Sequence, residues 1–173
     1  DNGAVHFLYC IEYERCFYTC SDDDGLSFCE PVEVTSTFEA FRPEYDWKVL
    51  ATGPGHGLHL QSGRLLSTAW LSTGENGNGH DPSVVATVYS DDHGKTWERG
   101  DIAVTGSVPM DPTEAIIVEL ADGRVMMNMR NRTRDKDTRK SARAVCTSPD
   151  GATNWTATWF DDALCEPECM GSI

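Results

Sequence analysis

A short pattern of polar and aromatic residues recurs three times and constrains the fold more than any other feature of the sequence. Residues 21–28 (Ser-Asp-Asp-Asp-Gly-Leu-Ser-Phe) and 90–97 (Ser-Asp-Asp-His-Gly-Lys-Thr-Trp) both read Ser-x-Asp-x-Gly-x-Ser/Thr-aromatic. Residues 148–155 keep the Ser, the Asp and the aromatic but displace the Gly and the Thr. In such a turn the aspartate accepts backbone N–H groups, the glycine takes a positive φ and the aromatic ring folds back. We therefore predict that these aspartates are structural and not catalytic, with calcium binding as the alternative.

A longer repeat lies in the middle of the chain. Residues 61–70 match residues 121–130 at an offset of 121 − 61 = 60, and each copy joins two apolar runs through a Gly-Arg turn. Further apolar runs at 84–89 and 142–147 lead into turns rich in Asp and Gly. Short apolar runs with this punctuation are typical of antiparallel hairpins, and no segment shows the spacing of an amphipathic helix. The sequence therefore predicts an all-β array.

Charge and hydropathy exclude several classes of partner. The 173-residue chain has 14 Lys+Arg against 28 Asp+Glu, which gives a net charge of −14. Binding to nucleic acid or to an anionic membrane surface needs clustered basic charge, so neither partner is expected. No apolar run approaches the roughly 18–20 residues that a membrane-spanning helix needs, so no membrane span is expected.

The seven cysteines are an odd number, so at least one of them has no partner within the chain. Cys165 and Cys169 have Cys-x-x-x-Cys spacing without a nearby histidine, which is a weak zinc pattern, and no metal site is predicted. Cys10 and Cys146 lie in apolar runs and are expected to be buried thiols. The compartment stays open, with a secreted or periplasmic location favoured.

The recurring turns resemble the Asp-boxes of the sialidase (neuraminidase) superfamily, and other segments extend the resemblance. Residues 52–64 (Thr-Gly-Pro-Gly-His-Gly-Leu-His-Leu-Gln-Ser-Gly-Arg) are similar to the Gly-Pro-Gly-His-Gly segment of exo-α-sialidases. The similarity continues through residues 113–120, 127–130 and 165–173, in the order that the family has them. The resemblance implies part of a six-bladed β-propeller whose blades are four-stranded antiparallel sheets.

The spacing of the turns indicates how much of a propeller this chain supplies. Successive turns start 90 − 21 = 69 and 148 − 90 = 58 residues apart. A chain of 173 residues therefore makes about three blades, with boundaries expected near 1–50, 51–110 and 111–173. A propeller that cannot close leaves open strand edges, so we expect the remaining blades of a longer enzyme to be partners of this chain.

The resemblance implies two site residues in the third predicted blade. Arg130 matches the second of three arginines that bind the carboxylate of sialic acid, a task suited to the parallel hydrogen bonds of a guanidinium group. Glu114, which lies 130 − 114 = 16 residues earlier, matches the glutamate that acts as base for a tyrosine nucleophile. A tyrosine, with a pKa near ~10, needs such a base. The alternatives are a surface arginine and a solvated carboxylate at strand ends.

Other residues near these motifs have weaker assignments. Trp70 corresponds to an aromatic near the glycerol tail of the substrate in related animal enzymes, and strand packing explains it equally well. His56 is expected at the rim of the same site or in a loop shaped by the glycines around it. Several charged residues are expected to be structural or solvated: Glu119 within a strand, Arg64 and Arg124 at equivalent Gly-Arg turns, and Arg132, Arg134 and Arg139 in a charged loop.

The resemblance implies that the parent protein is a retaining exo-α-sialidase that needs no cofactor. Its substrates would be sialylated glycans: glycoproteins, gangliosides and oligosaccharides that carry terminal sialic acids. The acid/base aspartate and the first arginine of the family would precede Asp1, and the tyrosine and the third arginine would follow Ile173. Met170 stands where many relatives have a glutamine, which removes a polar group expected near the site.

Three other functions fit parts of the pattern. A non-catalytic carbohydrate-binding propeller would keep the turns but lack the catalytic residues that other blades supply. A trans-sialidase would share the whole site. A purely adhesive β-array would make the pairing of Glu114 with Arg130 a coincidence. These alternatives predict different outcomes when the protein meets a sialoside.

Overall fold

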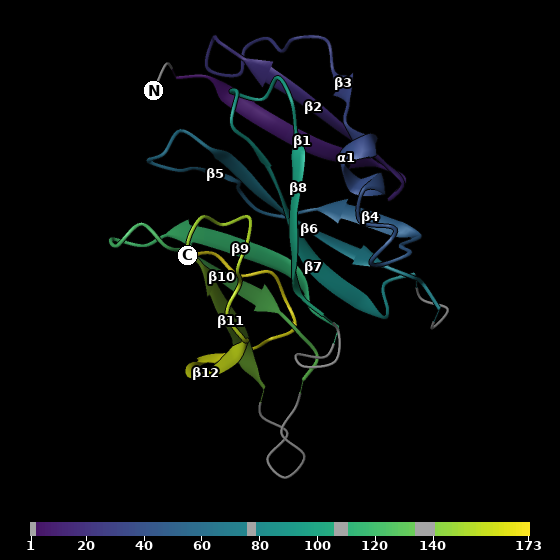
Figure 1. The fold of residues 1–173 in the computed structure, drawn as a ribbon, viewed down its shortest axis with the longest axis vertical. Helices are drawn as coiled ribbons and strands as arrows, with labels where there is room; N and C mark the ends of the chain where they lie inside the picture. The colour runs from purple at the N-terminus through teal and green to yellow at the C-terminus, as the bar shows by residue number, and fades with distance from the viewer. Residues whose placement is uncertain (1–2, 76–78, 106–110, 134–140) are drawn as a thin grey trace.

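Three antiparallel sheets make up the part of the chain that the computed structural model describes, residues 3–75, 79–105, 111–133 and 141–173. The sheets succeed one another in chain order along the long axis of the molecule (Figure 1). The first contains β1 (Val5–Ile11), β2 (Arg15–Ser21) and β3 (Val32–Glu33). The second contains β4 (Val49–Thr52), β5 (Leu58–His59), β6 (Leu65–Ser72), β7 (Ser83–Ser90) and β8 (Glu98–Val104). The third contains β9 (Thr113–Glu119), β10 (Val125–Arg130), β11 (Ala142–Ser148) and β12 (Trp159–Cys165).

Within the described parts of the chain, the third sheet has the four strands predicted for a blade, but the first and second sheets do not. The third has the order β12-β11-β10-β9, but the first has only β1-β2-β3 among the described residues. The second follows β4-β6-β7-β8, with β5 also paired to β6. After β3 the chain enters α1 (Thr35–Glu39), a helix of five residues that the sequence analysis did not predict. One helical turn is too short to display a period of about 3.6 residues, so the pattern held no signal for it.

Glycines shape the loop that separates β4 from β5, two strands that pair with successive parts of β6. A Cβ atom on Gly57 would lie 2.7 Å from the carbonyl oxygen of Leu66. A Cβ atom on Gly55, whose φ is +135°, would lie 3.0 Å from Cδ1 of Ile116. Only glycine lets the loop pass this close to β6 and β9. The sequence offers two positions for His56. The second of them, in a loop shaped by the glycines around it, is confirmed.

Two apolar clusters hold neighbouring sheets together. Leu66 of β6, Ile117 of β9 and Met127 of β10 belong to the cluster between the second and third sheets, and each is at most 1% exposed. Cys16 of β2 and Phe38 of α1 belong to the cluster that joins the first sheet to the second. Burial of each large side chain contributes about 1.5–3 kcal/mol, so these clusters fix how the three sheets meet.

The aspartates of the repeated turns accept hydrogen bonds inside their own turns. Asp23 accepts the N–H and the hydroxyl of Ser27 at 2.8 and 2.6 Å, and Asp92 accepts those of Thr96 at 2.8 and 2.7 Å. These hydrogen bonds lower the pKa of each aspartate to about 2. Asp150, in the altered third copy, still accepts two backbone N–H groups. The contacts give the aspartates the structural role that the sequence predicts.

Removal of one of these carboxylates is expected to weaken its turn in a pH-dependent way. The pKa of Asp23 is about 2, below the ordinary value of 3.8, so its stabilising effect is complete above pH 4 and is lost as the pH falls through 2. We expect Asp23→Ala to lower the thermal midpoint at pH 7, and the difference from the unchanged protein to shrink toward pH 2. Asp22→Ala, an exposed neighbour in the same turn, is the control. Equal midpoints for both variants at pH 7 would contradict this account.

Candidate active site

A cavity of about 290 Å³ is lined by strands of the second and third sheets and by loops, including the turn between β1 and β2. Its lining consists of Tyr13, Ala51, Thr52, Pro54, Trp70, His80, Thr113, Glu114, Arg130 and Arg132. The three residues that the sequence analysis selected, Glu114, Arg130 and Trp70, therefore face one space although 60 positions separate the first and last of them (130 − 70 = 60). This convergence makes the cavity the candidate active site.

A β-bulge places Glu114 in this cavity. Met129 pairs with Ala115 across β9 and β10, but Arg130 pairs with Thr113, so Glu114 is the extra residue in β9. Its φ is +27°, which is unusual for a residue with a side chain. Bulges of this kind redirect a side chain at the end of a ladder. The extra residue explains why Glu114 points toward Arg130 instead of continuing the alternation of the strand.

Glu114 and Arg130 form an ion pair at the end of the third sheet. Arg130 Nη1 lies 2.8 Å from Glu114 Oε2, and the two side chains are 25% and 23% exposed. A guanidinium group has five N–H donors, and within the described ranges this is the ion pair that Arg130 makes. Donors therefore remain for an anion that enters the cavity. The chemical roles of the two residues stay predictions at this point.

Aromatic rings form one wall of the cavity. The ring of Trp70 lies 5.1 Å from that of His80 and 6.1 Å from that of Tyr13, and the His80 and Tyr13 rings are 5.9 Å apart. Trp70 is only 5% exposed and belongs to the core between the second and third sheets. It therefore packs as a strand residue, as one expectation has it, and also lines the cavity. A contact with the glycerol tail of a substrate stays a prediction.

Tyr13 and His80 were not selected from the sequence. Tyr13 lies in the turn between β1 and β2, with a φ of +59°. His80 immediately precedes the Asp81-Pro82 pair ahead of β7. Both residues reach the cavity from loops, where no alternating pattern marks which side chain points inward. Only the packing of the sheets brings them beside Trp70.

Arg132 lies in the loop after β10, as expected, and its side chain is 36% exposed, but it also has an ion-pair partner that the sequence did not predict. Arg132 Nη1 lies 2.5 Å from Asp81 Oδ2, the Asp81 side chain is 8% exposed, and Arg132 lines the cavity. Asn131, which precedes it, is fully buried and donates from Nδ2 to the carbonyl oxygen of Ala142 at 3.1 Å. These contacts anchor the chain beyond the end of β10. Arg132 lines the same cavity as Arg130, which lies two residues earlier. Arg134 and Arg139 lie outside the described residues.

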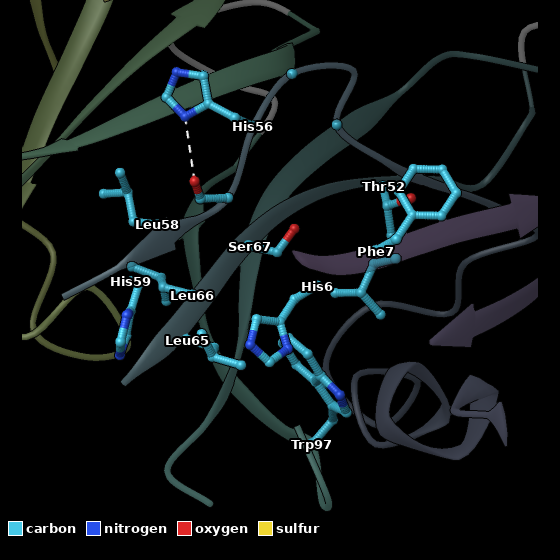
Figure 2. Close-up of a pocket in the computed structure, with 14 residues that line it drawn as sticks. His6, Phe7, Thr52, His56, Leu58, His59, Leu65, Leu66, Ser67 and Trp97 are labelled. Carbon is cyan, nitrogen blue, oxygen red and sulfur yellow. Dashed lines mark hydrogen bonds between the residues drawn. The ribbon is translucent and has the colours of Figure 1, made fainter. Parts of the chain in front are cut away.

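His56 does not line this cavity. It lies at one end of a separate cavity of about 390 Å³, beside the loop of glycines, whereas His6 and Trp97 lie at the other end (Figure 2). Its Nδ1 atom is 3.2 Å from the carbonyl oxygen of Gly57, and the side chain is exposed. The rim position considered for His56 is therefore incorrect.

The remaining charged residues have the structural positions predicted for them. Arg64 Nε lies 2.8 Å from Asp91, and Arg64 Nη1 lies 3.3 Å from Asp150, so this arginine links two of the repeated turns. Arg124 makes an exposed pair with Asp122 in its own turn. Glu119 accepts the backbone N–H of Gln61 at 2.9 Å. These contacts lie away from the candidate active site.

A buried ion pair supports the strand end that carries Arg130. Arg143 of β11 donates to Glu166 at 3.0 Å and to Asn128 of β10 at 2.6 Å. The Arg143 and Glu166 side chains are 6% and 0% exposed. Glu166 also accepts the backbone N–H of Asn131 at 3.1 Å. The cluster thus fixes the backbone immediately after Arg130 and was not predicted from the sequence.

Among residues 3–75, 79–105, 111–133 and 141–173, no group of three or more His, Cys, Asp or Glu side chains is arranged to hold a metal ion. In the same segments, no helix has the length and apolar character needed to cross a membrane.

The chain is similar to several known proteins. The family model described as "BNR repeat-like domain" matches residues 9–168. A sialidase of Bacteroides fragilis is 30% identical over 155 residues, which are 88% of this chain and 25% of that protein. A Hadza microbial sialidase and a leech intramolecular trans-sialidase complexed with 2,7-anhydro-Neu5Ac are both 27% identical, with TM-scores of 0.65. The matches cover 90% and 87% of this chain and 27% and 20% of those structures. The chain therefore spans about a quarter of the length of these relatives.

Proposed function

The chain belongs to the BNR repeat-like family within the sialidase superfamily, and from that premise we propose that the protein of which it is part is an exo-α-sialidase. The substrates would be glycans that end in an α-linked sialic acid, on glycoproteins, gangliosides or oligosaccharides. Water would replace the glycan at the anomeric carbon with retention of configuration. No cofactor is needed for this reaction.

The ion pair of Glu114 and Arg130 in the cavity carries the proposal. Arg130 would bind the carboxylate of the sialic acid through the donors that Glu114 leaves available, because a planar guanidinium group matches a carboxylate in two parallel hydrogen bonds. The 2.8 Å contact with Glu114 holds the guanidinium in place before the substrate arrives. The pair would therefore set both the position of the substrate and the position of the base.

Glu114 would take the proton of a tyrosine that another blade supplies. The tyrosine oxygen would then attack the anomeric carbon, and a second acid from another blade would protonate the departing glycan oxygen. Hydrolysis of the resulting sialyl-tyrosine would return the tyrosine and release the sugar. A tyrosine suits this substrate because a carboxylate nucleophile would be repelled by the carboxylate already on the anomeric carbon, and sialidases are known as this exception among glycosidases.

Formal charge near the cavity is balanced and not positive. Arg130 faces Glu114, and Arg132 faces Asp81, while the chain as a whole carries −14. Long-range attraction of an anionic glycan would therefore be weak on this side of the molecule. Recognition would depend on short-range hydrogen bonds from Arg130 and from arginines of other blades.

The aromatic wall would hold the uncharged part of the sugar. Trp70 lies at the base of this wall and is in contact with His80. We propose that this surface packs against the glycerol side chain of sialic acid, with Trp70 as the anchor. Tyr13, which is 51% exposed, would extend the same surface toward the solvent.

Each sheet would be one blade of a larger propeller, with boundaries near residues 50 and 110. The first sheet exposes apolar side chains at alternate positions of β1, with Val5, Phe7 and Ile11 40%, 52% and 42% exposed. At the other end, Trp159 of β12 is 43% exposed. Exposed apolar surface of this kind marks contacts with further protein. The remaining blades would cover these surfaces.

Hydrolysis of a fluorogenic sialoside by the full-length protein tests the proposal. Arg130→Lys keeps the charge but loses the paired hydrogen bonds, so we expect KM to rise about 10- to 100-fold. Arg124→Lys is the matched control, because Arg124 pairs with Asp122 on the surface and its replacement should leave KM unchanged. An active protein whose KM is unaffected by Arg130→Lys would remove Arg130 from the substrate site.

The similarity to the leech intramolecular trans-sialidase favours one second candidate function. In that reaction a hydroxyl of the sugar itself would replace water, and an anhydro sugar would be released in place of free sialic acid. The residues of the cavity would act in the same way in both reactions. Chromatography of the product distinguishes them, and binding of sialosides without any product would identify a non-catalytic carbohydrate-binding propeller.

A further inference from the structure

Two cysteines face each other across the first of the repeated turns. Cys20 is the second-last residue of β2, and Cys29 lies nine positions later, beyond the turn. The backbone N–H of Cys29 donates to the carbonyl oxygen of Cys20 at 2.9 Å, and the two Sγ atoms are 3.7 Å apart. This hydrogen bond and the short distance between the sulfur atoms place the two residues side by side where the chain enters and leaves the turn.

The spacing of these positions suits a disulfide. Disulfides join residues whose Cα atoms are about 4.4–6.8 Å apart, and the direct backbone hydrogen bond of 2.9 Å between Cys20 and Cys29 keeps their Cα atoms close together. The sulfur atoms need to approach by somewhat less than 2 Å to reach the bond length of about 2.05 Å. Rotation of the two side chains can supply that movement without a shift of the backbone.

We propose that Cys20 and Cys29 form a redox-sensitive disulfide that closes this turn. Cys29 is exposed and Cys20 is half-buried, so a small oxidant in solution can reach them. By contrast, Cys16 and Cys146 are fully buried, as predicted for Cys146. Cys10, predicted to be buried as well, is only half-buried.

The oxidant would be a low-molecular-weight disulfide such as oxidised glutathione. The thiolate of Cys29 attacks one glutathione sulfur, the glutathione S–S bond breaks, and one glutathione thiolate leaves. The thiolate of Cys20 then attacks the Cys29 sulfur of this mixed disulfide and displaces the second glutathione. Two protein thiols are thereby oxidised, one glutathione disulfide is reduced to two thiols, and the two protons from the cysteines pass to the departing thiolates.

The disulfide would also affect the contact between the first and second sheets. Tyr18 lies two residues before Cys20, on the same face of β2, and its ring is 5.5 Å from that of Trp97 in the second repeated turn. The Tyr18 hydroxyl is hydrogen-bonded to His6 at 2.8 Å, and His6 is the register partner of Cys20 on β1. A closed turn beside these residues would restrict local opening of this sheet.

Mass spectrometry of the full-length protein tests the proposal. The protein is incubated with oxidised glutathione at pH 8.5, because the hydrogen bond between the two thiols raises the pKa of Cys29 and thiolate is needed for exchange. Remaining thiols are alkylated, and the protein is cleaved with trypsin and Asp-N. Asp-N cuts before Asp22, Asp23 and Asp24, between the two cysteines, so only a disulfide can keep their peptides joined.

We expect the joined peptides in the unchanged protein and in Cys169→Ser, and their absence in Cys20→Ser and after treatment with dithiothreitol. We also expect oxidation to raise the thermal midpoint of the unchanged protein by roughly 5 °C, and to leave that of Cys20→Ser unchanged. Stable mixed disulfides with glutathione at Cys29 without joined peptides would overturn the proposal. Pairing of Cys29 with a cysteine other than Cys20 would overturn it as well. None of these outcomes depends on whether the protein hydrolyses sialosides.

Discussion

Replacement of Glu114 by glutamine is expected to lower kcat for sialoside hydrolysis by the full-length protein about 10²- to 10⁴-fold. Glutamine keeps the size of the side chain and can still accept a hydrogen bond from Arg130, but it cannot take a proton from the tyrosine. Because Glu114 would act on the nucleophile and not on the sugar, KM should change much less than kcat. The measurement is a full kinetic curve with a fluorogenic sialoside.

Glu119→Gln provides the matched control for this prediction. Glu119 belongs to the same strand, but its carboxylate accepts the backbone N–H of Gln61 at 2.9 Å and does not line the cavity. Its replacement should leave kcat within about twofold of the unchanged protein. A Glu114→Gln variant that remains folded and retains full kcat would show that Glu114 is not the base.

Replacement of Glu166 by glutamine is expected to destabilise the protein by about 3–5 kcal/mol, because it leaves the buried charge of Arg143 without its partner. The two side chains are 0% and 6% exposed and their nearest charged atoms are 3.0 Å apart. Burial raises the pKa of Glu166, while Arg143 and two backbone N–H groups oppose that shift. The free energy of unfolding, from chemical denaturation at pH 7, measures the loss.

An exposed pair of the same chemistry is the control for Glu166. Arg15 and Glu33 form two hydrogen bonds at 3.1 and 2.6 Å, but their side chains are 53% and 42% exposed. Solvent screens such pairs, so Glu33→Gln should have a much smaller effect than Glu166→Gln. Equal losses of stability in the two variants would mean that burial does not determine how much the Arg143–Glu166 ion pair contributes to the free energy of unfolding.

The strands and turns of this chain were predictable because their signals are local. A run such as Val84–Tyr89 between turn residues marks a strand wherever it occurs, and the carboxylates of Asp23 and Asp92 bond to residues four positions away. The helix α1 had no such signal, because a single turn is shorter than the period that identifies a helix. Its buried Phe38 became interpretable only from the packing of the second sheet.

The candidate site was predictable only where a family motif fell on it. Glu114 and Arg130 were selected through a resemblance, and the bulge that turns Glu114 inward cannot be read from alternation, since it breaks the alternation. Arg132 looked like part of a solvated charged segment because its partner, Asp81, lies 132 − 81 = 51 residues away. Arg143 and Glu166 are also far apart in the sequence, because most of β11, a loop and β12 lie between them. Long-range partners of charged residues therefore account for most of what the sequence did not predict.

The measurement that tests the central claim most directly is proton NMR of the full-length protein acting on an α-linked sialoside. If Glu114 activates a tyrosine and Arg130 binds the carboxylate, the α-anomer of sialic acid should appear first and convert slowly to the β-anomer. Both products should be lost together in Glu114→Gln. A β-anomer that appears first, or an intact sialoside after prolonged incubation with folded protein, would contradict the account.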